Sequence, residues 1–139
     1  MRDRIVSNLT TRFDAFDALV AQLDDEALHA KLDIEKHKSL AEHLWCVVGS
    51  RESYAKAITE GSWSGFACSV SSFSKADFTT KLIQSAELVD VAIGSVEDWS
   101  DERERLLADL AEHEVMHEGQ IIRHVLGTGN DLPSTWKWA

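Results

Sequence analysis

The chain has 139 residues, of which 44% are hydrophobic, and 24 acidic side chains against 14 basic ones give it a formal net charge of −10. A surface this acidic repels nucleic-acid phosphates and anionic lipids, so we expect neither nucleic acid nor a membrane among the partners. No apolar run reaches the roughly 18 residues of a membrane span and no signal-peptide core opens the chain, which predicts a cytoplasmic protein with a single domain over residues 1–139.

The first half of the chain predicts two amphipathic helices with a short helical piece between them. Apolar residues recur at helical spacing from about residue 3 to residue 23, and a short piece follows from residue 26 to about residue 30. The run Ser39-Leu40-Ala41-Glu42 has the sequence of a capping box. It predicts a second long helix that starts at Ser39 and ends near Gly61.

The one long loop covers residues 61–74 and is rich in glycine and serine. Fully extended, its length reaches roughly 46 Å, enough to cross from one end of a helical bundle to the other. The helices on either side of it therefore need not be antiparallel neighbours. Its aromatic residues Trp63 and Phe66 are expected to pack over an opening or, as the alternative, to plug the end of the bundle.

Two further helices are predicted in the second half. The third starts at Ser74 and closes at Trp99 and Ser100, and the fourth runs from Ser100 to Gly127 or Gly129. Two tryptophans in the last ten residues, Trp136 and Trp138, predict that the tail docks on the bundle or on a second subunit. The fold class is therefore all-α, a four-helix bundle with a long crossover loop between the second and third helices.

A pair of histidines at metal-ligand spacing lies on the fourth predicted helix. His113 and His117 are four residues apart, so they sit one above the other on one helix face, with Cβ atoms roughly 6 Å apart. Both occupy the apolar stripe, where leucine or isoleucine is normal. His43 lies on the apolar stripe of the second helix. The alternative interpretation is that all three are hydrogen-bonded core histidines.

The remaining histidines and a cysteine are given other roles. His29 and His37 lie in a polar connector and are interpreted as solvated. His124 is two turns past His117, too far for the same ion, and is interpreted as a core or interface residue. Cys46 is one turn from His43; a small core residue is its usual role, and contact with the site is the alternative.

The segment from His113 to His117 also fits the HExxH pattern of zinc proteases, with Glu114 as general base. The longer protease signatures are missing. Gly119 and His124 fall at the wrong offsets for one class, and no glutamate downstream supplies the third ligand of another. A version with Asp131 as third ligand has only the short motif in its favour.

Two stretches together resemble the DinB/YfiT-like superfamily of metal-dependent four-helix-bundle proteins. They are Ser39-Leu40-Ala41-Glu42-His43-Leu44-Trp45 and His113-Glu114-Val115-Met116-His117-Glu118-Gly119-Gln120-Ile121. The resemblance spans the chain in length and helix order, and it implies that His43, His113 and His117 bind a divalent metal, most often zinc or nickel. Two positions depart from the family: many members have a basic residue where this chain has Glu118, and some have histidine where it has Met116.

The resemblance implies an enzyme acting on a small-molecule substrate, in a homodimer. One function is to present a low-molecular-weight thiol cosubstrate as the thiolate for transfer to an electrophile. The alternatives are a hydrolase that uses metal-bound hydroxide and a non-catalytic metal-binding or dimeric scaffold. Glu114 and Gln120 are the weak catalytic candidates: Glu114 is interpreted as solvated or as a support to the ligands, and Gln120 as orienting a ligand or bridging helices.

Overall fold

The computed structural model describes residues 1–138, and the all-α expectation is confirmed, because every regular element in that part of the chain is a helix. Four helices are long and one is short. They are α1 (Arg2–Gln22), α2 (Asp25–His29), α3 (Leu40–Glu60), α4 (Lys75–Ser95) and α5 (Asp101–Gly127). None of the helices in residues 1–138 combines the length and the hydropathy that crossing a membrane requires.

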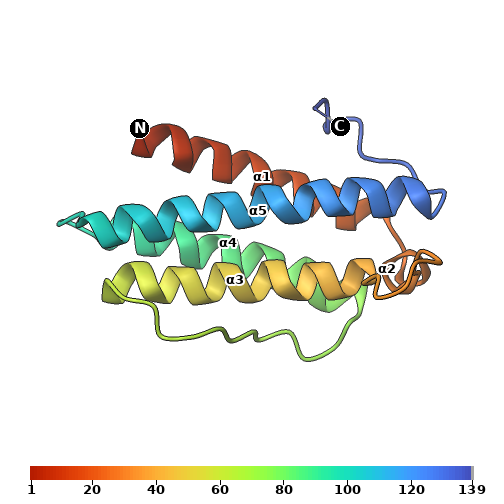
Figure 1. The fold of residues 1–139 in the computed structure, drawn as a ribbon, viewed down its shortest axis with the longest axis horizontal. Helices are drawn as coiled ribbons and strands as arrows, with labels where there is room; N and C mark the ends of the chain where they lie inside the picture. The colour runs from red at the N-terminus through yellow and green to blue at the C-terminus, as the bar shows by residue number, and fades with distance from the viewer. Residues whose placement is uncertain (139) are drawn as a thin grey trace.

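The four long helices lie side by side along the long axis of the molecule (Figure 1). α3 packs against both α4 and α5, and α1 packs against the same two helices. The segment 61–74 follows the outside of α3 and reaches α4 at the end of the molecule where α3 begins (Figure 1). There the backbone N–H of Lys75 donates to the carboxylate of Asp25, so the start of α4 lies beside α2.

Local signals in the sequence set the helix ends. The Ser39 hydroxyl accepts from the N–H of Glu42 while the Glu42 carboxylate accepts from the N–H of Ser39, which is the predicted capping box. Gly61 follows α3 with φ 78°, a left-handed conformation that favours a residue without Cβ. Ser74 and Ser100 cap α4 and α5, each accepting from the N–H three residues on.

α4 ends earlier than the sequence predicts. The expected closure at Trp99 and Ser100 is wrong, because the helix ends at Ser95 and Val96 is already extended. Gly94 immediately precedes this end, and glycine is among the weakest helix formers. The apolar spacing that suggested a longer helix is real, but it continues through non-helical residues that still face the core.

Two apolar clusters fill the interior, one toward each end of the long helices. Buried members are Phe16, Leu44 and Ile121 in the first cluster, and Phe13, Ile58 and Leu107 in the second. Both clusters take side chains from α1, α3, α4 and α5. The first also receives the tail through Trp136, so the docking of the C-terminal residues is part of the core.

A buried ion pair lies where the two clusters meet. Arg51 on α3 and Glu114 on α5 are both 0% exposed, and Nε and Nη2 donate to the two carboxylate oxygens at 2.8 and 2.9 Å. The guanidinium carbon also lies 4.2 Å from the ring centroid of Phe13 and 5.4 Å from that of Phe16. A bidentate pair between guanidinium and carboxylate forms in only a narrow range of orientations, so it fixes the register of α3 against α5.

The C-terminal tail docks on α1, as its two tryptophans predict. Trp136 is 4% exposed, and its indole N–H donates to the backbone oxygen of Ala15 at 3.0 Å. Trp138 stacks on Trp136, and the guanidinium carbon of Arg12 lies 4.7 Å from its ring. Within residues 1–138, the tail therefore packs on its own chain.

The aromatic residues Trp63 and Phe66 of the long segment pack against α3, where Phe66 also lines a pocket. The ring of Trp63 lies 4.9 Å from that of Tyr54, and the ring of Phe66 lies 5.1 Å from that of Trp45. Both partners belong to α3, so these contacts attach the segment to the side of that helix. Gly49 makes room for this, since a Cβ there would clash with the Phe66 ring.

The buried ion pair predicts a distinctive stability pattern. Glu114→Gln should lower the free energy of unfolding by about 3–5 kcal/mol, because it leaves the Arg51 charge buried without a counter-charge. The double substitution Arg51→Met/Glu114→Met should cost clearly less than Glu114→Gln alone. Urea unfolding measures both. Glu60→Gln, in an exposed pair with Lys56 on α3, is the matched control and should cost less than about 0.5 kcal/mol.

Candidate metal centre

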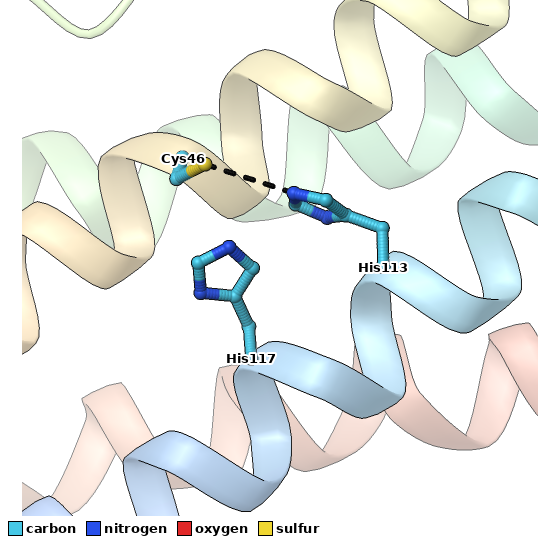
Figure 2. A group of neighbouring side chains, drawn as sticks. All are labelled: Cys46, His113 and His117. Carbon is cyan, nitrogen blue, oxygen red and sulfur yellow. Dashed lines mark hydrogen bonds between the residues drawn. The ribbon is translucent and has the colours of Figure 1, made fainter.

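The predicted site residues lie at the interface of α3 and α5. His43 and Cys46 come from α3, and His113 and His117 come from α5. Figure 2 shows the last three, with the α5 rings directed toward α3. His43 meets His117 near one end and Ser50 meets His113 further along, so the residue numbers run in opposite directions and the two helices are antiparallel.

His43 and His117 approach each other closely, although 74 positions separate them in the chain. Their Nδ1 atoms are 3.1 Å apart and their ring centroids 5.3 Å apart. Both side chains are buried, with 5% and 3% of their surface exposed. The predicted convergence of these two histidines inside the fold is therefore observed.

His113 adds a second imidazole beside His117, with ring centroids 4.5 Å apart. Its Nε2 lies 3.0 Å from the Ser50 hydroxyl and 3.6 Å from the Cys46 sulfur, the contact drawn in Figure 2. Its Nδ1 is buried and has no hydrogen-bond partner within residues 1–138. A buried nitrogen without a partner is unusual, and a metal is one thing that satisfies it.

One group of side chains in the described residues is close enough to hold a metal ion. A ligand atom from each of Cys46, His113 and His117 lies within 4.8 Å of the other two. Contact of Cys46 with the site, the alternative to a core role in the sequence analysis, is what the structure shows. Its spacing of three from His43 puts both residues on the same face of α3.

Burial keeps the imidazoles neutral. It is the main cause that lowers the pKa of His43 to about 4 and that of His117 to about 3, from an ordinary 6.5. Burial also lowers the pKa of His113, while the neighbouring Glu114 acts in the opposite direction. A neutral imidazole is the form that binds a metal, so these rings need not release a proton at pH 7.

The thiol of Cys46 is in a different state. Burial raises its pKa, with the charge of Lys38 and a hydrogen bond to Ser50 acting in the opposite direction. Only the thiolate binds a metal, so Cys46 has to lose a proton before it can serve as a ligand. His113 and His117 are therefore the better prepared donors of the group.

A second histidine pair lies next to this cluster. His37 Nε2 is 3.0 Å from His124 Nδ1, and the two rings are stacked with an interplanar angle of 1°. His43 lies 6.4 and 6.5 Å from these rings, measured between centroids. The core role predicted for His124 is confirmed by its 0% exposure, whereas His37, predicted to be solvated, is half-buried. His124 continues the stripe of His117, whereas nothing in the connector indicated where His37 would lie.

The other candidates have defined environments. Both oxygens of Glu114 accept from Arg51, so of its two expected roles the solvated one is wrong. Gln120 is exposed and lines a pocket together with His43. Glu118 is 4% exposed and lies 3.1 Å from Arg12.

His29 is exposed, as expected, and its Nε2 lies 2.8 Å from the backbone oxygen of Phe73. It belongs to α2 and has no part in the cluster at the α3–α5 interface. Its side chain is therefore a suitable control in experiments on the other histidines.

Compared with known proteins, the chain matches no family model and no curated protein. The DinB/YfiT-like resemblance therefore stays a prediction.

The metal-free protein should lose stability as the pH falls below about 6.5. Since the pKa values of His43 and His117 are lower in the folded chain than in an unfolded one, the unfolded state binds more protons in this window. Between pH 7 and pH 5 each residue should remove about 1–2 kcal/mol from the free energy of unfolding. Urea unfolding of the wild type, His117→Gln and the control His29→Gln measures this. His117→Gln should lose less over the interval than His29→Gln, and equal losses would contradict the burial argument.

Proposed function

We propose that this protein is a divalent-metal-dependent enzyme of the DinB-like type, which activates a low-molecular-weight thiol for transfer to an electrophile. The observation that carries the proposal is the 3.1 Å approach of His43 and His117 inside the fold. His113, one turn before His117, adds a third neutral imidazole, which is half-buried, beside the two buried ones. The thiol cosubstrate is favoured by the sequence resemblance.

The separation of the His43 and His117 nitrogens fits two ligands of one divalent ion. Two nitrogens bound to one tetrahedral zinc lie about 3.3 Å apart, close to the observed separation of the His43 and His117 nitrogens. Imidazole suits zinc and nickel, whereas magnesium and calcium prefer oxygen ligands. The nearest buried carboxylate, that of Glu114, is already held by Arg51.

We assign His43, His113 and His117 as the ligands, with Cys46 beside them. A divalent cation held there would act as a Lewis acid and lower the pKa of a thiol. Three protein ligands are typical of catalytic sites, which keep a position for the substrate. Ser50 orients the His113 ring through its 3.0 Å contact with Nε2. Partial or full burial lowers the pKa of all three rings, which keeps them unprotonated at pH 7.

The proposal extends to the fold. The four long helices form a four-helix bundle, and residues 61–74 are the crossover between its second and third members. Supporting this are the packing of α3 and α1 on both α4 and α5 and the path of the segment along α3. With this connectivity α3 and α5 are antiparallel neighbours, as their histidine contacts require.

Metal titration tests the ligand assignment. His43→Ala, His113→Ala and His117→Ala should each weaken zinc and nickel affinity by at least about tenfold, because a three-ligand site does not survive the loss of one ligand. His29→Ala should leave the affinity unchanged. Competition with a chromophoric chelator measures all four.

Cys46→Ser separates the two possible ligand sets. It should change the affinity by less than about threefold, since a serine hydroxyl preserves the shape but not a metal–sulfur bond. A loss as large as that of His43→Ala would move the third ligand to Cys46. Wild-type protein that binds neither zinc nor nickel would overturn the metal proposal and favour the scaffold.

Turnover tests the thiol. The metal-loaded protein is incubated with an aryl or alkyl halide, with and without each of a panel of cellular thiols. Thiol should be consumed in step with halide release. Removal of the metal, or the substitution His117→Ala, should reduce both rates to those of the uncatalysed reaction. Turnover that ignores the thiol would contradict the transferase and favour the hydrolase.

A further inference from the structure

A pocket of about 660 Å³ opens beside the histidine cluster. Its walls come from the connector between α2 and α3 and from the last turns of α5. His43 is shared, since it lines this pocket and also contacts His117. A molecule bound in the pocket therefore lies next to the proposed metal ligands.

The pocket is cationic in an otherwise acidic protein. Lys36, Lys38 and Arg123 line it and no carboxylate does. Across residues 1–138, no ion pair joins Lys38 or Arg123 to an acidic residue, and Lys36 pairs only with exposed Glu35, at 3.9 Å. With a net charge of −10, this chain has more than enough acidic side chains to pair these three. Unpaired cations at one concave place indicate an anion-binding site.

The backbone of the connector supports the same conclusion. Residues 34–37 form a turn in which the N–H of His37 donates to the oxygen of Ile34 at 3.1 Å. Lys36 has φ 63° there, a conformation that normally favours glycine or asparagine. Such conformations concentrate at binding sites. Lys36 therefore places a positive charge at the pocket although its backbone conformation is unfavourable for a residue with a Cβ atom.

The charge of Lys38 reaches the cluster. After the larger effect of burial, it contributes to lowering the pKa of His43 and also acts on Cys46 and His117. Lys38 therefore lines the pocket and is also near enough to the cluster to act on charges there. An anion bound to Lys38 would therefore lie near the histidine cluster.

We propose that this pocket binds the carboxylate of a small organic acid, with Lys36, Lys38 and Arg123 around the charge and the apolar side chains of Leu32 and Ile34 against the hydrocarbon part. The acid would be the substrate or cosubstrate of the enzyme, and that part of the proposal rests on the proposed function. Binding itself requires only the pocket. Arg123 and the lysines provide N–H donors for carboxylate oxygens, and Gln120 provides a neutral donor on the same wall.

The test uses the full chain without metal and three probes of equal length: hexanoate, 1-hexanol and hexylammonium. Amide chemical shifts in a heteronuclear NMR titration report binding. Hexanoate should shift the amides of residues 32–38 and 120–127 and bind more tightly than 1-hexanol, and hexylammonium should not bind. Hexanoate that binds no more tightly than 1-hexanol would overturn the proposal.

Variants test the charges. Lys38→Gln and Arg123→Gln should each weaken hexanoate binding by about twofold to fivefold, as expected for exposed charge pairs. Lys56→Gln, an exposed lysine toward the other end of α3, should have no effect. Lys36→Gly removes a charge and relieves the backbone, so it should weaken binding while raising the unfolding midpoint, and a folding defect cannot explain that result. Unchanged binding in all three pocket variants would overturn the proposal.

Zinc titration of the same variants separates this proposal from the proposed function. The zinc affinity of Lys38→Gln and Arg123→Gln should stay within about threefold of wild type, since neither residue is an assigned ligand. Wild-type protein that binds hexanoate but no zinc would support the organic-acid pocket and contradict the metal-dependent enzyme. Wild-type protein that binds zinc but not hexanoate would support the metal site and overturn the organic-acid proposal.

Discussion

The buried pair of Arg51 and Glu114 sets the position of α3 against α5, and the histidine cluster depends on that position. Both charges are removed from water, so the pair is tolerated only with both hydrogen bonds made. A shift of one residue along α5 would turn His117 by about 100° around the axis of that helix, away from His43. Glu114 directly follows His113 in the chain, so the ion pair and the cluster move together. We therefore interpret the role of Glu114 as holding the histidines in register.

Much of the fold follows from local signals in the sequence. The capping box at Ser39 and the glycine at position 61 delimit α3 within a residue, because a cap is formed by neighbouring residues. The meeting of His43 with His117 could be predicted as well, since each lies on the apolar stripe of its own helix. The end of α4 could not, because its apolar spacing continues past the last helical hydrogen bond. Nor could the stacking of His37 on His124, which depends on the path of a connector without periodicity.

Cys46 and Glu114 show a different limit. A helical stripe tells which residues face inward, but the exact partner of each depends on the rotation and register of two helices. Cys46 lies on the same face as His43, and the packing of α3 on α5 places its sulfur 3.6 Å from Nε2 of His113. The sequence leaves Glu114 as either solvated or a support to the ligands, because the arginine that makes its burial possible lies 63 positions away. Long-range pairing of charges is not visible in a single sequence.

The central claim is that imidazoles from α3 and α5 hold one metal ion. Anomalous scattering from crystals grown with zinc or nickel tests it most directly, since data collected on either side of the absorption edge locate the ion and identify it. The account predicts one strong peak between His43, His113 and His117. A peak between His37 and His124 instead, or no peak at the α3–α5 interface from well-ordered crystals, would contradict it.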